Sequence, residues 1–191
     1  MNLQLVVPNE WADITIEQYQ EFNKNLNSNL SKKKKLTKSI SILCNVEEKV
    51  VNKLKTRDLQ EIAVEINKLE NVKPYSIKLK KQFDYKGFRY GLIPNLSEMT
   101  TGEFIDLETW CSDDKSTENL HKIMSILYRP IIEKENVAGQ YKIENYDPEI
   151  EKENVMLDLP MDIALGCLNF FFHLGAQLIE NLDNSLNKKK K

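Results

Sequence analysis

The segment from Pro160 to Leu186, PMDIALGCLNFFFHLGAQLIENLDNSL, constrains the fold most, because as a helix it is apolar on nearly every side. Pro160 suits the first helical position. A helix without a polar face has to be covered by other protein on most sides. We favour a helix at the centre of the core. The alternatives are a helix covered in part by another chain and a membrane span, for which the segment is short and interrupted by polar residues. If another chain provides cover, the candidate partner-binding residues are Phe170, Phe171 and Leu174.

Two other helix starts carry the same local signal, ITIEQY at Ile14–Tyr19 and MTTGEF at Met99–Phe104. In each, a threonine stands three residues before Gln or Glu, the pattern of a capping box. An apolar residue before the threonine and an aromatic residue after the box complete a hydrophobic staple. We therefore predict helices that begin after Thr15 and after Thr100. As a hypothesis, the two boxes fix two helices that flank a hairpin and present a rigid apolar surface to a partner.

The sequence between the two capping boxes first predicts helices. Leu59, Ile62, Ala63, Ile66 and Leu69 recur at spacings of three and four, which is one stripe of an amphipathic helix. Asn45 and Thr56 are candidate N-caps of two successive helices. Pro74 ends this helical region, since its ring opposes helix continuation.

The pattern then changes to that of a β-hairpin at about 76–93, around the turn DYKG with Gly87 available for positive φ. A hairpin alone is marginal in water. It therefore has to pack on the helices, pair with a partner, or form a small sheet with the N-terminal strand LQLVV.

After Pro94 the chain returns to helices, one of which places Leu120, Ile123, Met124 and Leu127 on one side. A charged loop at about 133–157 lacks an apolar period and suits a long surface excursion. Residues 188–191 form a lysine tail. The predicted fold is mainly α: a single domain over 1–187, a helical bundle around the hydrophobic C-terminal helix with one inserted β-hairpin.

The residues that usually carry chemistry do not form a catalytic pattern. His121 and His173 lie in apolar helical stretches without a ligand at helical spacing, and Asp113 and Asp114 fit a turn. The three cysteines are far apart beside apolar residues, so we expect buried free thiols. Glycine-rich phosphate loops and nucleophile elbows are absent from the sequence. We expect a protein that is not an enzyme and has no cofactor or metal.

Lysine runs carry the only concentrated charge, in a chain whose formal net charge is −2. Lys32, Lys33, Lys34 and Lys35 are candidate phosphate contacts, for weak binding that ignores sequence. No aromatic residue is interleaved to stack on bases, and arginine is scarce, so solvated loops and a solubilising tail are the preferred interpretation. We expect neither nucleic acid nor a membrane as the main partner.

Three stretches carry a resemblance to a known group. They are WADITIEQYQEF at Trp11–Phe22, the hairpin and second box from Phe83 to Leu107, and NLHKIMSILYRPI at Asn119–Ile131. Over about two thirds of the chain they resemble small helical proteins encoded among the virion and tail genes of tailed bacteriophages, some of which are labelled tail assembly chaperones. The lysine and asparagine content suits phages of low-GC hosts, including crAss-like ones.

The resemblance implies a non-enzymatic role in tail or virion assembly through contacts with other phage virion or tail proteins, or with a second copy of the chain. The alternatives are a structural or internal cargo protein retained in the mature particle, and a weak nucleic-acid-binding accessory. The start MNLQLVVPNEW lacks the features of a signal peptide, so the expected location is the host cytoplasm during assembly, or the virion.

Overall fold

The structure is a computed structural model that describes residues 5–71, 76–111, 116–133, 140–148 and 153–188, and the side chains of the last helix as far as Leu174. The described residues form seven α-helices and one four-stranded antiparallel sheet, so the protein is mainly helical, as predicted.

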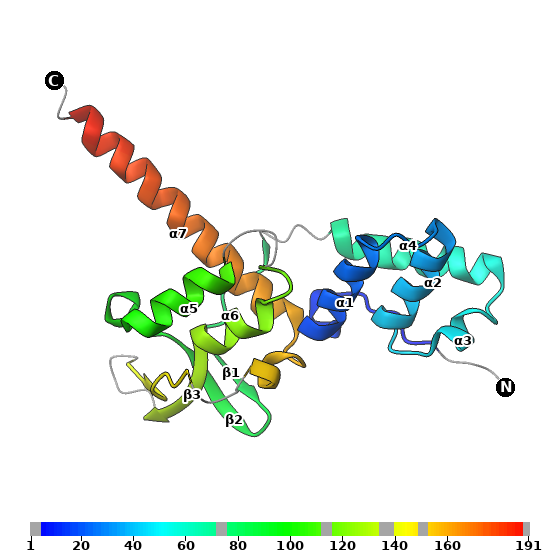
Figure 1. Cartoon of the computed structure of the whole chain (residues 1–191), viewed down its shortest axis with the longest axis horizontal. Coiled ribbons are helices and arrows are strands. Elements are labelled where there is room, and N and C mark those ends of the chain that lie inside the picture. The colour runs from blue at the N-terminus through cyan, green and yellow to red at the C-terminus, as the bar shows by residue number, and fades with distance from the viewer. Residues whose placement is uncertain (1–4, 72–75, 112–115, 134–139, 149–152, 189–191) are drawn as a thin grey trace.

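Figure 1 shows two lobes and a long helix that leaves one of them. The helical lobe holds α1 (Ile16–Leu26), α2 (Lys32–Leu43), α3 (Glu48–Val51) and α4 (Thr56–Asn71). The sheet lobe holds β1 (Gln82–Tyr85), β2 (Phe88–Leu92), α5 (Thr101–Cys111), α6 (Leu120–Leu127), β3 (Tyr128–Glu133), β4 (Lys142–Ile143) and the start of α7 (Met161–Lys188). The described residues also include the 3-10 turns η1 (Trp11–Asp13), η3 (Leu96–Glu98) and η5 (Glu153–Met156).

Both predicted capping boxes are present. The backbone N–H of Gln18 donates to the Thr15 hydroxyl at 3.1 Å, and the N–H of Thr15 donates to the Gln18 side chain at 2.9 Å. The second box has the same two bonds, Glu103 N–H to the Thr100 hydroxyl at 3.2 Å and Thr100 N–H to the Glu103 carboxylate at 2.6 Å. The boxes therefore set where α1 and α5 begin.

In the helical lobe α2 packs against α1, α3 and α4, and the predicted stripe of α4 is buried or half-buried throughout. Asn25 is buried in α1, where its amide donates to the carbonyl of Lys35 at 2.8 Å and to the Ser39 hydroxyl at 2.9 Å. The prediction that Asn45 caps a helix is wrong: it follows α2 with a φ of 49°, and Glu47 precedes α3. Asn45 makes the left-handed turn that this residue type tolerates best after Gly.

The predicted hairpin is confirmed at β1 and β2, with Phe83 opposite Tyr90 and Tyr85 opposite Phe88. Lys86 and Gly87 between the strands both have positive φ, at 47° and 83°, which is the geometry of a tight hairpin turn.

Of the candidate strand LQLVV, Leu3 and Gln4 lie outside the described residues, and Leu5–Val7 do not pair with the hairpin. The described residues from Leu5 to Asn9 form no strand, and β2 pairs instead with β3, Leu92 opposite Tyr128 and Tyr90 opposite Pro130. The sheet order is β1-β2-β3-β4. Where the structure describes it, the charged loop contains β4 and η5, and its Tyr141 hydroxyl donates to the Leu92 carbonyl at 2.7 Å.

The two lobes are joined where α1 and α7 begin. Near the start of α1 the N–H groups of Ile16 and Glu17 donate to the carbonyls of Leu159 and Leu157, at 3.0 and 2.9 Å, and the N–H of Met161 donates to the Ile14 carbonyl at 2.7 Å. The first turn of a helix leaves such N–H groups without helical partners. The segment before α7 supplies those partners, so the first capping box stands at the junction of the lobes.

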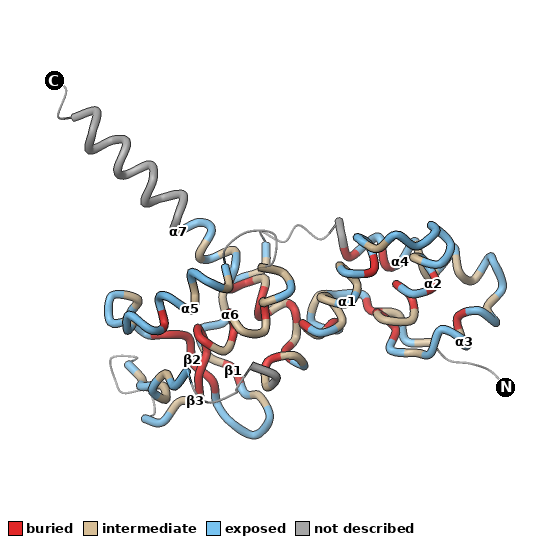
Figure 2. Tube along the Cα trace, viewed as in Figure 1, coloured by how far each residue is buried: buried red, intermediate tan, exposed pale blue. Residues whose placement is uncertain are grey.

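The predicted bundle around the C-terminal helix is not confirmed. Only the first turns of α7 enter the core, where Met161, Ala164 and Cys167 are buried, and the helix then projects from the body (Figure 1). Figure 2 shows the remaining buried residues within the two lobes. At the point of entry a Cβ on Gly166 would lie 2.5 Å from the carbonyl oxygen of Lys78. Glycine at that position lets the helix approach the backbone of residues 78 and 79.

Candidate interaction surface

The projecting part of α7 exposes large apolar side chains. Phe172 is 67% exposed, and Leu168 and Phe170 are exposed as well. Residues on the side of α7 that faces the body, such as Cys167, are buried. None of the helices in the described part of the chain is long and apolar enough to cross a membrane.

The predicted partner-binding residues lie around this exposed stretch. Phe170 is exposed and its ring meets that of Phe171 edge-on at 5.3 Å, while Phe171 and Leu174 are half-buried. The sequence did not single out Phe172, the most exposed of the three consecutive phenylalanines. In a helix that is apolar all round, only the position of the body decides which side is left open.

A second exposed apolar site lies on α5, where the first turn buries a charged side chain and exposes two apolar ones. Glu103 is 3% exposed, whereas Phe104 and Ile105 beside it are 58% and 53% exposed. The staple expected between Met99 and Phe104 therefore does not bury the aromatic ring. We call Phe104 and Ile105 the α5 ridge.

A buried ion pair explains why Glu103 is buried and the α5 ridge is exposed. The guanidinium of Arg129, on β3, donates to the Glu103 carboxylate at 2.5 Å, and both side chains are buried. Burial alone raises the pKa of the Glu103 carboxyl, but hydrogen bonds from Thr100 and the charge of Arg129 outweigh it, so the pKa of Glu103 is below its ordinary value. One turn further along α5, the Tyr146 hydroxyl donates to the Asp106 carboxylate at 2.5 Å. These polar contacts tie α5 to β3 and to the charged loop, and they hold the α5 ridge outward.

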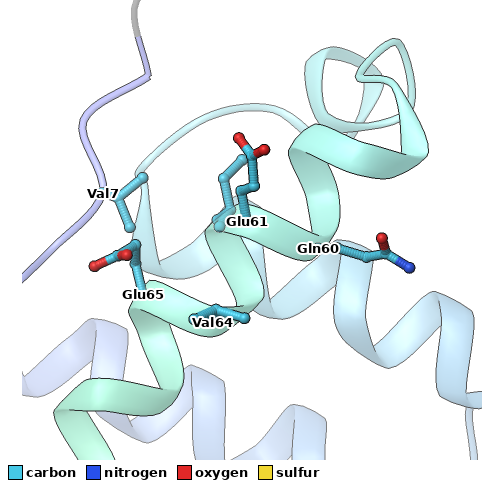
Figure 3. Close-up of a pocket in the computed structure, with 6 residues that line it drawn as sticks. Val7, Gln60, Glu61, Val64 and Glu65 are labelled. Atoms are coloured by element: carbon cyan, nitrogen blue, oxygen red, sulfur yellow. The ribbon is translucent and has the colours of Figure 1, made fainter.

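An open hollow of about 550 Å³ lies beside α4, between Val7 of the N-terminal segment and Glu61, Val64 and Glu65 (Figure 3). Its carboxylates are already paired along the helix, Glu61 with Arg57 at 2.9 Å and Glu65 with Lys68 at 2.6 Å. The hollow offers an apolar floor with solvated charges and no convergent catalytic groups.

The histidines and acidic residues considered for catalysis or metal binding do not form one cluster in the described residues. His173 is exposed on α7, and the Nδ1 of His121 lies 2.9 Å from the Gln20 amide nitrogen, in a contact between α6 and α1. Asp113 and Asp114 lie outside the described residues. Among the described residues, no group of three His, Cys, Asp or Glu side chains is placed to hold a metal.

The cysteines follow the prediction in part. Cys44 and Cys167 are buried free thiols, and burial raises their pKa to about 11 and about 12, so neither is a thiolate at neutral pH. Cys111 is exposed, so the expectation that it is buried is wrong.

The first lysine run forms the first turn of α2, where a loop was the preferred interpretation, with Ser31 as N-cap. Lys32, Lys33 and Lys34 are exposed, and the ammonium of Lys35 donates to the Leu26 carbonyl at 2.5 Å. Three solvated ammonium groups on one turn supply charge but no shaped phosphate site.

The described surface thus exposes large apolar side chains on α5 and α7, and further ones at Phe88 on β2, Ile132 on β3 and Val64 on α4. Comparison with known proteins adds no relative: no family model, no curated protein and no solved structure matches this chain.

Proposed function

We propose that this chain is a non-enzymatic bacteriophage protein that acts in tail or virion assembly through protein–protein contacts. The observation that carries the proposal is the α5 ridge: two large apolar side chains held outward by a capping box and a buried ion pair. A surface designed only for solubility would place Phe104 or Ile105 inside and Glu103 outside. Rigid exposed apolar side chains are typical of binding sites, because they lose little conformational entropy when a partner covers them.

The bacteriophage context rests on the sequence resemblance given above, and the contact role rests on the α5 ridge and the exposed side of α7. In this proposal the helical bundle around α7 forms in the assembled state, where helices of a partner cover what the body leaves open. The partners are other virion or tail proteins, in the host cytoplasm during assembly.

The experiment is complementation of a phage that lacks this gene with variants of the chain. Changing Phe104 and Ile105 together to Glu should lower the yield of infectious particles at least tenfold, because two charges cannot be buried at an apolar contact. The matched control is Val64→Glu, since Val64 is 56% exposed on α4, in the other lobe, and should leave the yield unchanged. Circular dichroism of each purified variant checks that the fold is intact. Normal yield with the double variant would overturn the role of the α5 ridge.

Retention in the particle separates the two assembly roles. A chaperone should be missing from purified virions by quantitative mass spectrometry, whereas a structural or internal cargo protein should be present in many copies. Many copies per virion would replace the chaperone proposal by the cargo alternative.

A further inference from the structure

The helical lobe has an apolar groove that the α5 ridge does not involve. It has a volume of about 260 Å³ and is lined by residues of α1, α2 and α4, the helices gathered in that lobe in Figure 1. Its large apolar lining residues are Phe22, Leu26, Leu36 and Ile66, and we call it the three-helix groove. We propose that the three-helix groove binds an amphipathic helix of another protein, with an apolar face and acidic residues at one end.

The lining residues of each helix recur at helical spacing. Phe22 and Leu26 on α1 are four residues apart, and Ala63 and Ile66 on α4 are three apart. Residues at these spacings lie on one face of a helix, so each helix turns a face towards the groove. Helix α2 packs against both α1 and α4. A groove between helix faces is complementary to a further helix, whose ridges of side chains fit between theirs.

The groove leaves apolar surface in contact with water. Leu26 and Leu36 are exposed, and Phe22 is half-buried. A partner that covers these side chains removes their apolar surface from water, which favours binding. The lining residues of α2 run from Lys32 to Ser39, about 10 Å along the helix axis at 1.5 Å per residue. A partner helix of two to three turns therefore spans the groove.

The charge at the groove selects an acidic partner. The charged side chains among its lining residues are Lys32 and Lys35, both in the first turn of α2. The ammonium of Lys35 is held there by the Leu26 carbonyl at 2.5 Å, and Lys32 is exposed. The N-terminus of α2 adds partial positive charge at the same end. Glu61 and Glu65 of α4 line the separate hollow beside α4. The three-helix groove is thus positive where α2 begins and apolar beyond it, which fits an apolar helix with carboxylates at one end.

A peptide fits this groove better than a nucleic acid does. Phosphates could neutralise the lysines, but a nucleic acid backbone has no apolar side chains to cover Leu26 and Leu36. A leucine-rich helix with an acidic end satisfies both parts of the groove at once.

The experiment measures binding of the full chain to a fluorescent synthetic peptide by anisotropy. The peptide has about 18 residues, with leucine at spacings of three and four, glutamates in one terminal turn and alanine elsewhere. It should bind with a dissociation constant of tens of micromolar at low salt, and more weakly as salt screens the charges. The same peptide with lysines in place of the glutamates should bind at least about tenfold more weakly, because like charges meet. No binding of the acidic peptide, or equal affinity for both peptides, overturns the proposal.

Two variants locate the site. Leu36→Asp should weaken binding of the acidic peptide at least about tenfold, because it puts a charge among apolar contacts. The matched control is Val64→Asp, since Val64 is exposed on α4 outside the groove and should leave the affinity unchanged. Lys32→Glu changes an exposed side chain, and it should weaken the acidic peptide and strengthen the basic one. Circular dichroism checks the fold of each variant.

An affinity that Leu36→Asp leaves unchanged overturns the proposal. Duplex DNA that binds while the acidic peptide does not would overturn it as well, and would assign the lysines to phosphate contacts. The three-helix groove and the α5 ridge lie in different lobes, and these measurements use purified protein. Their failure is therefore distinct from normal particle yield with the α5 ridge variant.

Discussion

The buried pair of Glu103 and Arg129 gives the sharpest test of how the α5 ridge is held. Glu103→Gln keeps an oxygen that can accept the Thr100 N–H, so the capping bond survives and the negative charge is lost. The change leaves the buried guanidinium without its partner charge. Removing one member of a buried ion pair destabilises a protein by about 3–5 kcal/mol. Since domains of this kind are stable by about 5–15 kcal/mol, a loss of about 3 kcal/mol is large.

The assay is urea denaturation followed by circular dichroism, with Glu108→Gln as the matched control. Glu108 is an exposed glutamate on the same helix, so its replacement should change the free energy of unfolding by less than about 0.5 kcal/mol. Glu103→Leu combined with Arg129→Met should be more stable than Glu103→Leu alone, because the double variant leaves no buried charge. A loss below about 1 kcal/mol for Glu103→Gln would refute the reasoning, since it would mean that water reaches the pair.

The same pair predicts a pH dependence. The pKa of Glu103 is lower in the folded chain than in the unfolded chain, so the unfolded state binds its proton first as the pH falls. The stability that the carboxylate contributes is therefore fully present above the unfolded value of about 4.3 and is lost as the pH falls through the folded pKa. Between pH 5 and pH 3 the wild-type chain should lose more stability than Glu103→Gln, which has no proton to gain at that position.

Three further predictions concern the rest of the chain. Thr15→Ala and Thr100→Ala should each lower the free energy of unfolding by about 1 kcal/mol, and an unchanged melting temperature in both would remove the capping hypothesis. Gly166→Ala should cost about 1–3 kcal/mol because the new Cβ meets the Lys78 carbonyl at 2.5 Å, whereas Gly102→Ala, with nothing within 4 Å, should be neutral or stabilising by denaturant titration. Duplex DNA should bind more weakly than about 100 µM at 150 mM salt; micromolar affinity that falls steeply with salt and is lost when Lys32–Lys35 become Ala would support the nucleic-acid alternative instead.

Local signals predicted local structure well in this chain. The capping boxes at Thr15 and Thr100 formed as expected because their donors and acceptors lie within four residues of one another. The hairpin turn was predicted from DYKG for the same reason, since Gly87 supplies positive φ wherever the strands end up. The buried stripe of α6 also needed only the spacing of its own residues.

The predictions that failed concern features that depend on residues far away in the sequence. Strand β3 begins at Tyr128 directly after α6 and contains Pro130, and its pairing with β2 and β4 makes it a strand. The role of Arg129 was missed for a similar reason. Nothing near it in sequence indicates a carboxylate, and Glu103 was already accounted for by the capping box. One residue that caps a helix and also neutralises a buried charge gives a sequence signal for the first role only.

The placement of α7 shows what apolar composition can and cannot decide. The composition of Pro160–Leu186 requires cover, and the structure shows that the chain itself covers the stretch up to Cys167. Beyond that point the stability of a helix comes mainly from packing of an apolar face, since propensity alone leaves a helix of this length marginal. Phe171 and Leu174 are half-buried there, but Phe172 is 67% exposed, so the body provides that packing on one side of the helix only. A projecting helix of this composition is therefore most stable when other protein covers its exposed side.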